Sequence, residues 1–282
     1  MNAEQKRNLQ SWLAICLVMV CVAMPLLSNV DRMAYEDPGW DTPEEAVLVY
    51  LEGLKEQNIE KMISAYAVET CVDHFDLKAQ LARLRAYTVS MIPRVPNSGD
   101  LLRGINIEAR KNEIVQSILL QMTSICLPGQ DFSQTIPFTG DDGDKAVAAF
   151  VDGIESAFGA VDFSALKFLG FMPPEQLSEL YASERNQENI RAQIAPYGAE
   201  EARSVIALFM INDKFCALTC DVMRYGDQWF MYKPGGNIAS LMGLSVLSGG
   251  VISVPQEELV AMREGLGAPA QKLLDDLLSG LF

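Results

Sequence analysis

The chain has one histidine, His74, and carboxylates stand close on both sides of it in the run Asp73-His74-Phe75-Asp76. A histidine beside carboxylates can serve as a general base or as a metal ligand. A solvated position in a loop or at a helix start explains the same run without chemistry, and we favour that interpretation. The single histidine excludes an HExxH zinc motif, and no G-x-S-x-G turn presents a serine nucleophile.

Acidic residues gather in the run Asp141-Asp142-Gly143-Asp144. An EF-hand calcium loop needs alternating ligands, with glycine at its sixth position and glutamate at its twelfth, and this run lacks that spacing. A solvated turn in which Asp144 caps a helix explains the run better. The glycine pairs at 235–236 and 249–250 form neither a phosphate loop nor a dinucleotide fingerprint. We therefore predict no metal site and no cofactor, and the sequence identifies no catalytic residue.

An uncharged apolar run extends from Trp12 to Leu27, behind Lys6 and Arg7. Its length lies near the lower limit of about 17 residues for a membrane-spanning helix. A cleaved signal peptide fits the length as well, but no A-x-A cleavage site is present, so we favour a retained anchor within residues 1–30. Because the basic residues precede the run, the expected orientation is N-terminus inside and C-terminus outside.

The targeting segment sets the predicted compartment. We expect a single-pass protein of the cell membrane, held in the cytoplasmic membrane through residues 12–30, with residues 31–41 as a polar linker. Secretion after signal cleavage is the alternative. The formal net charge of −15 opposes binding to phosphate backbones, so we expect no nucleic-acid partner.

Four cysteines follow the targeting segment: Cys71, Cys126, Cys216 and Cys220. Disulfides are permitted in an exported chain, and buried free cysteines are the alternative. Cys216 and Cys220 cannot pair with each other on one strand. Four residues at about 3.3 Å each hold their Cα atoms roughly 13 Å apart, whereas a disulfide needs less than about 7 Å.

The clearest helix start is Thr42-Pro43-Glu44-Glu45, which supplies an N-cap hydroxyl, a proline at the first helical position and the glutamate of a capping box. An apolar stripe at helical spacing follows it: Val47, Tyr50, Leu51 and Leu54. A second short helix begins after Gln57-Asn58. Further helices are predicted over 76–87, 105–125, 144–158, 174–181 and 184–194.

Beyond Arg203 the chain becomes rich in β-forming residues. Three runs, 205–211, 214–225 and 228–233, are separated by Asn212-Asp213 and Gly226-Asp227, which suit two-residue hairpin turns. Such turns fix the register of an antiparallel meander. The expected pairs are Ile211 with Lys214, Phe209 with Cys216, Val205 with Cys220, Tyr225 with Gln228, Met223 with Phe230 and Asp221 with Tyr232.

Alternation along these strands separates two faces of the predicted sheet. The apolar face should pack on helices, and it carries Val205, Ala207, Phe209, Cys216, Leu218, Cys220, Val222, Trp229 and Met231. The other face is mixed, and it carries Phe215, Thr219, Asp221, Met223, Tyr225, Gln228, Phe230 and Tyr232.

The last part of the chain, 234–282, has two sections. Ile238 to Val254 is uncharged but rich in glycine and serine, which favours a buried segment over a second membrane helix. Leucines on one side of a predicted helix at 273–281 indicate docking on the protein's own domain, with self-association or a partner groove as the alternative.

Together these patterns predict an α+β protein. A membrane helix precedes an α+β domain over 42–233, which contains a helical insertion at about 76–200. An antiparallel meander of three strands or more lies near the C-terminus of that domain.

The opening Asp41-Thr42-Pro43-Glu44-Glu45-Ala46-Val47, with Tyr50, Leu54 and Lys55, resembles the start of NTF2-like domains. The run Gly226-Asp227-Gln228-Trp229-Phe230-Met231 looks like their last strands, so the resemblance covers 41–66 and 203–233. It implies a curved sheet that wraps helices into a cup for small molecules or peptides. A long, mainly helical stretch separates the two parts, more than that fold usually holds, and no catalytic pattern of the family can be placed.

If the resemblance holds, it makes the mixed face the lining of the cup. The candidate ligand-binding residues are then Asp221, Tyr225, Tyr232 and Thr219. A partly solvated outer face is the alternative, because antiparallel sheets often expose one side.

The expected function is non-enzymatic binding of a small ligand or of an envelope protein outside the membrane. One alternative is a hydrolase or isomerase that uses Asp221 or His74 in an NTF2-like pocket, and another is a structural interaction module. A closed apolar pocket that holds Asp221 and a tyrosine, with the pKa of the carboxylate raised, would favour the enzyme.

Overall fold

The computed structural model describes residues 37–85, 96–129, 135–140, 143–241 and 248–255. The predicted anchor within 1–30 and the leucine-rich helix at 273–281 lie outside these residues. Within the described ranges, no helix combines the length and the apolar character that a membrane crossing requires.

Helices and one antiparallel sheet make up the described part of the chain. The α-helices are α2 (Pro43–Lys55), α3 (Ile59–Ser64), α4 (Glu69–Asp73), α5 (Leu77–Leu84), α6 (Asp100–Cys126), α7 (Gly143–Gly159), α8 (Pro174–Leu177), α9 (Glu184–Ile194) and α10 (Gly236–Leu241). Short 3-10 helices are η2 (Phe163–Ala165), η3 (Glu179–Ala182) and η4 (Ala195–Tyr197). The strands are β1 (Lys167–Met172), β2 (Glu201–Ile211), β3 (Lys214–Tyr225), β4 (Gln228–Pro234) and β5 (Val251–Pro255).

The sheet has the strand order β1-β2-β3-β4, and β5 also pairs with β3. β4 pairs with β3 from Cys220 to Tyr225, whereas β5 pairs with it from Lys214 to Leu218. Because β2 occupies the other edge of β3, the strands β4 and β5 follow one another along a single edge. The prediction of a mixed helix and sheet protein with an antiparallel sheet near the C-terminus is confirmed.

The register of the meander follows the turn chemistry. All three predicted pairs of the first hairpin occur, as do Tyr225 with Gln228 and Met223 with Phe230. The predicted pair of Asp221 with Tyr232 is wrong, because a bulge places Lys233 opposite Asp221. The extra residue in β4 is Tyr232, and its carbonyl oxygen accepts a hydrogen bond from Arg110.

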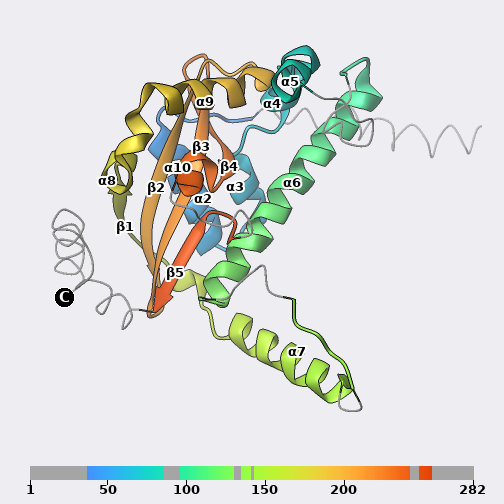
Figure 1. The fold of residues 1–282 in the computed structure, drawn as a ribbon, viewed down its shortest axis with the longest axis vertical. Coiled ribbons are helices and arrows are strands. Elements are labelled where there is room, and N and C mark those ends of the chain that lie inside the picture. Colours follow the sequence, from blue (N-terminus) through green and yellow to red (C-terminus); the bar gives the residue numbers. More distant parts are fainter. Residues whose placement is uncertain (1–36, 86–95, 130–134, 141–142, 242–247, 256–282) are drawn as a thin grey trace, which may run out of the picture. The chain divides into compact units, whose positions relative to one another are not determined.

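Both faces of the sheet are covered by helices. The predicted apolar face joins the apolar stripe of α2 and residues of α6 in one core cluster. On the other face, Ile206 and Leu208 pack against Tyr181, Ile190 and Ile238. Figure 1 shows α10 on one side of the sheet and α2 on the other. The mixed face is therefore largely buried.

Two short elements were not expected from the sequence. β1 lies inside the segment predicted to be helical, where Gly170 adopts φ 153° next to a break in the β1–β2 register. β5 comes from the uncharged segment after Gly235 and adds to the sheet rather than forming a helix. Neither strand alternates between apolar and polar residues, which is the pattern that predicts a half-buried strand.

The cysteines after the targeting segment are free and buried, namely Cys71, Cys126, Cys216 and Cys220. Burial raises the pKa of Cys216 to about 11, so its thiol stays protonated at neutral pH. These residues fill space in the core, so the alternative of buried free cysteines is confirmed.

Candidate functional site

Thr219 lies at the junction where β4 leaves β3 and β5 joins it. Its N–H donates to the Gly250 carbonyl at 2.8 Å, and its carbonyl accepts from the Gly235 N–H at 2.7 Å. The hydroxyl lies 3.2 Å from the Gly235 carbonyl oxygen and 3.0 Å from the Gly250 carbonyl oxygen. The side chain is fully buried, and these contacts give it a structural role at the junction.

Asp221 is buried beneath the start of α10. Its Oδ1 accepts a hydrogen bond from the Ser204 hydroxyl at 2.7 Å, and the Asn237 N–H donates to both carboxylate oxygens at 3.1 Å and 2.9 Å. Burial raises the pKa of Asp221 above its ordinary value, and the hydrogen bonds from Ser204 and Asn237 oppose that shift. The carboxylate thus ties α10 to β2 and β3.

Tyr225 and His74 lie together at the end of α4. The Tyr225 hydroxyl donates to the Tyr197 carbonyl at 2.9 Å, and its ring centroid is 5.3 Å from that of His74. His74 is exposed, and its Nδ1 is 2.9 Å from the Thr70 carbonyl. Neither side chain approaches Asp221 in any contact of the described residues, so the structure does not bring a histidine and a carboxylate together there.

Tyr232 belongs to a cluster around a buried arginine, Arg110 of α6. The Arg110 Nη2 donates to the Tyr232 carbonyl at 2.6 Å, Nε to the Ala67 carbonyl at 3.3 Å and Nη1 to Glu113 Oε2 at 3.1 Å. The guanidinium carbon lies 5.4 Å from the centroid of the Tyr232 ring, a cation–π geometry. A guanidinium has five N–H donors. Two of them therefore have no hydrogen-bond partner among the described residues.

A cavity of about 240 Å³ lies beside this cluster, and we call it the Arg110 pocket. It is lined by Tyr66, Arg110, Glu113, Ile114, Ser117, Tyr197, Tyr232, Lys233 and Pro234. Tyr66 is fully buried, and its hydroxyl makes no hydrogen bond of standard geometry with a described residue, although the Gln121 side chain lies near enough to oppose the rise in its pKa. Buried polar atoms nearly always have a partner, so the Tyr66 hydroxyl has hydrogen-bonding capacity that the described residues do not fully use.

Burial controls the ionisation of the pocket. It raises the pKa of Tyr66 and that of Tyr232 far above the usual range, so both hydroxyls remain neutral. Burial also opposes the charge of Arg110, but neighbouring groups, among them Cys71 and Glu113, outweigh it and leave the arginine pKa raised. Arg110 therefore stays charged at neutral pH, and Glu113, which pairs with it, lines the same pocket.

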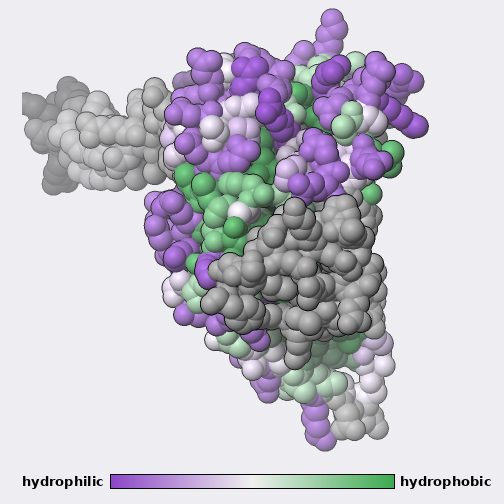
Figure 2. All heavy atoms as spheres, turned by 90° about the vertical axis from the view of Figure 1, so that its left-hand side faces the viewer, coloured by the Kyte–Doolittle hydropathy of each residue, from purple (hydrophilic) through white to green (hydrophobic). Residues whose placement is uncertain are grey.

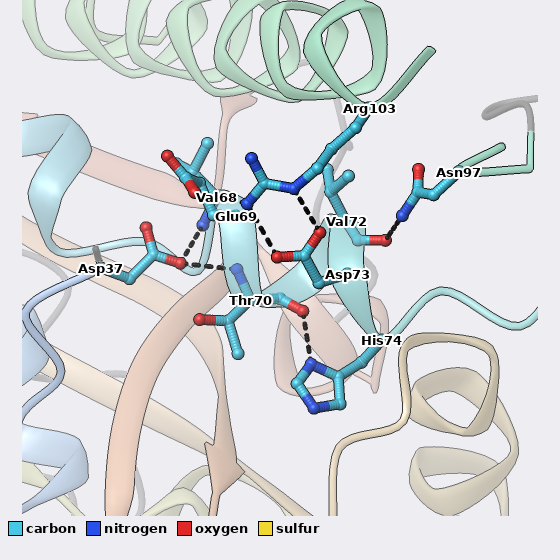
Figure 3. A network of polar contacts seen from close by, with 9 residues as sticks. All are labelled: Asp37, Val68, Glu69, Thr70, Val72, Asp73, His74, Asn97 and Arg103. Atoms are coloured by element: carbon cyan, nitrogen blue, oxygen red, sulfur yellow. Dashed lines mark hydrogen bonds and ion pairs between the residues drawn. The ribbon is translucent and has the colours of Figure 1, made fainter. Parts of the chain in front are cut away.

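The short helix α4 follows Tyr66 and Ala67 directly, and polar contacts fix its start. The Asp37 carboxylate accepts hydrogen bonds from the N–H groups of Val68 and Thr70 at 3.0 Å and 2.8 Å (Figure 3). The N-cap residue of α4 makes no side-chain capping hydrogen bond. Asp37, which lies far away in the sequence, caps the helix instead.

An ion-pair network then fastens α4 to α6. Arg103 contacts Asp73 through Nε at 2.7 Å and Nη2 at 2.8 Å, and Nη2 also contacts Glu69 at 2.6 Å (Figure 3). The forked contact sets the orientation of the two helices as well as their distance. This arrangement holds the Ala67 carbonyl in place for Arg110.

Sequence reasoning identified Tyr232 but missed Arg110. The predicted helix over 105–125 was correct, and α6 buries Ile107, Ile114 and Ile118 along one side. Arg110 stands three residues after Ile107 and four before Ile114, so it falls within the apolar stripe. A charged residue inside such a stripe is the signal that could have found it.

Among the described residues, no group of three or more histidine, cysteine, aspartate or glutamate side chains is arranged to hold a metal ion. The acidic run at 141–144 lies partly outside the described residues.

Comparisons with known proteins give little further information. No protein-family model matches the chain, and no curated protein matches it. A solved structure, a cystatin-like protein from Ruminococcus gnavus, aligns with a TM-score of 0.37 at 14% identity, over 67% of this chain and 39% of the other. The chain thus spans about two fifths of the length of that protein, and this level of similarity supports no argument about fold or function.

Proposed function

We propose that the chain is a membrane-anchored, extracytoplasmic binding protein that holds a small anionic ligand in the Arg110 pocket. The observation that carries this proposal is a buried arginine with two N–H donors that have no partner among the described residues. Beside it lies Tyr66, whose buried hydroxyl makes no standard hydrogen bond there. A carboxylate or phosphate oxygen satisfies both kinds of group, because a guanidinium binds such oxygens in a fixed, forked geometry.

The remaining lining defines the rest of the ligand. Lys233 adds a second positive charge at the edge of the pocket, and Tyr197 and Tyr232 present aromatic rings 4.9 Å apart by their centroids. The volume of about 240 Å³ lies below that of most drug-sized sites, which span roughly 300–1,000 Å³. The chemistry fits a small acid with a compact apolar or aromatic body.

An NTF2-like cup is the fold we propose around this pocket. Its support is the packing of α2 across the apolar face of the sheet, together with Met62 and Ile63 of α3. α6 lies beside the end of β4 and supplies the arginine, so the helical insertion contributes directly to the site.

An enzyme that uses Asp221 has one observation in its favour, the raised pKa of this buried carboxylate. Both of its oxygens, however, are bound by Ser204 and Asn237, and the residue lines neither the Arg110 pocket nor the larger cleft described below. We therefore assign Asp221 a structural role within this proposal. The interaction module that depends on the helix at 273–281 concerns residues outside the described part.

Isothermal titration of the full-length chain in detergent tests the ligand class, with benzoate and inorganic phosphate as probes. We expect binding of one or both anions. Tyr66→Phe should weaken it about fivefold, since one hydrogen bond contributes on the order of 1 kcal/mol. Lys233→Gln should weaken anion binding more at low salt than at high salt.

Lys167→Gln provides the matched control, because Lys167 is an exposed lysine at the start of β1 and does not line the pocket. It should leave the affinity unchanged. Failure of both anions to bind at roughly 1 mM would reject the proposed ligand class.

The proposed location has its own test. Membrane fractionation should find the chain with the membrane, and protease added outside intact cells should digest everything beyond the anchor. A full-length, protected chain would contradict the outward orientation.

A further inference from the structure

β1 pairs with only part of β2. The N-terminal end of β2 is left without a neighbouring strand on that edge among the described residues. The last pair between them joins Met172 and Ile206. Pro173 and Pro174 then lead the chain into α8. Proline has no N–H to donate to a ladder, so β1 cannot continue along β2. Among the described residues, no strand therefore pairs with residues 201–205 of β2 on this side.

Ser204 shows which backbone groups face the open edge. Its N–H donates to the Tyr181 hydroxyl at 2.7 Å, on the side away from β3. Backbone groups alternate between the two edges of a strand, so the N–H and C=O of Ala202 lie on the same edge as those of Ser204. A strand edge in this state is a template for another strand.

A cleft of about 730 Å³ runs along this edge, and we call it the β2-edge cleft. It shares no lining residue with the Arg110 pocket. Apolar side chains from β1, η3, α9 and β2 form part of its wall, namely Met172, Tyr181, Ile190 and Ile206. Figure 2 views the molecule from the side where β1 and α8 lie in Figure 1, and it shows hydrophobic atoms exposed there between hydrophilic ones.

The charged residues of the cleft are mainly acidic. Four glutamates and two arginines line it: Glu44, Glu175, Glu200, Glu201, Arg191 and Arg203. Arg203 is engaged by Glu201 at 2.7 Å, whereas Glu44 and Glu175 form no ion pair with any described residue. Arg191 also has no ion pair with a described residue, so the unpaired charges of the cleft are two carboxylates and one guanidinium. Their sum is negative, which favours a positively charged partner.

We propose that the β2-edge cleft binds an extended, basic segment of a partner protein, which adds to β2 as a strand in line with β1. In this mode the backbone of the segment pairs with the N–H and C=O of Ala202 and with the C=O of Ser204, because the Ser204 N–H already donates to Tyr181. Alternate side chains provide specificity. Side chains on one face of the segment pack against Met172 and Tyr181, which line the cleft and keep a small exposed surface. A lysine or arginine meets Glu44 or Glu175.

A short synthetic peptide of alternating lysine and valine tests the proposal, with the full-length chain in detergent and fluorescence anisotropy as the measurement. A second peptide has the same sequence but carries N-methyl groups on alternate backbone nitrogens, which removes the donors of one edge and keeps every charge. We expect the first peptide to bind and the second to bind at least tenfold more weakly. Equal affinities would overturn strand addition, and no binding of the first peptide at roughly 1 mM would overturn the proposal.

Two substitutions separate the cleft from general acidic attraction. Glu175→Lys in α8 should weaken peptide binding about fivefold, because it replaces an attractive charge by a repulsive one. Glu188→Lys makes the same change on an exposed residue of α9 that does not line the cleft, and it should leave binding unchanged. Equal losses in both variants would overturn the assignment to the cleft. A self-associated chain that the peptide cannot dissociate would mean that a second copy fills the cleft, which also overturns the proposal.

Discussion

The Arg110 guanidinium in α6 donates a hydrogen bond at 2.6 Å to the carbonyl of Tyr232 in β4, 122 positions away in the sequence. It also reaches the Ala67 carbonyl just before α4. One buried cation therefore joins three segments that are distant along the chain. The Tyr232 carbonyl makes this contact at the bulge that places Lys233 opposite Asp221.

Arg110→Lys should lower the free energy of unfolding by about 3 kcal/mol, because an ammonium cannot reproduce the three divergent contacts and leaves carbonyl groups unpaired in a buried site. Urea unfolding measures the change. Arg191→Lys is the control, since Arg191 is exposed on α9, and it should change stability by less than about 0.5 kcal/mol. Similar values for the two variants would contradict a structural role for Arg110.

Gly236→Ala should destabilise the protein by about 2 kcal/mol or more, since Gly236 has φ 56° and a Cβ atom there would lie 2.3 Å from Asp221 Oδ1. The backbone must come this close for the Asn237 N–H to reach the carboxylate. Gly104→Ala makes the same change within α6, where a Cβ atom meets nothing within 4 Å, and it should stabilise by about 1 kcal/mol. Thermal unfolding of both variants distinguishes the sites.

The local geometry of the meander could be predicted because the sequence signals that determine it act over a short range. Two-residue turns at Asn212-Asp213 and Gly226-Asp227 set the pairing of residues on either side, and alternation then separated the faces. Asn212 has φ 54° and Gly226 has φ 58°, as such turns require. The register failed only at Asp221, beside the bulge that the distant helix α6 contacts.

The candidate site residues show the same limit of prediction from short-range sequence signals. Thr219 and Asp221 have the polar groups that a ligand site needs, but partners far along the chain, such as Gly250 and Asn237, already bind those groups. Arg110 stood within a correctly predicted helix, yet nothing local to it indicates that Tyr232 lies beside it. Long-range packing decides which polar side chains are satisfied and which remain available for binding.

Arg103→Ala should lower the free energy of unfolding by about 1 kcal/mol. This value is at the upper end of the range for an exposed ion pair, because Arg103 contacts both Asp73 and Glu69 and thus forms a network. Hydrogen exchange of the α4 amides should become faster. Lys111→Ala removes a surface pair with Glu108 on the same helix and should cost less than about 0.5 kcal/mol. Unchanged exchange in α4 would show that Arg103 does not fasten it.

Asp221→Asn should reveal how burial of this carboxylate affects stability at different pH values. Burial raises the folded-state pKa of Asp221, whereas the unfolded chain restores the ordinary value of 3.8. A group with a raised folded pKa contributes stability that is fully present below the unfolded pKa and is lost as pH rises through the folded pKa. The free energy of unfolding of the wild type, minus that of the variant, should therefore increase as pH falls from 7 towards 3.5.

Urea unfolding of both proteins across this range gives the difference, and subtraction removes the effect of every other titrating group that the two share. Asp213→Asn, in the exposed turn between β2 and β3, provides the reference for an aspartate outside the core. If the Asp221 difference instead decreased on acidification, the hydrogen bonds from Ser204 and Asn237 would outweigh burial, and Asp221 would be held as a carboxylate that anchors α10 by its charge.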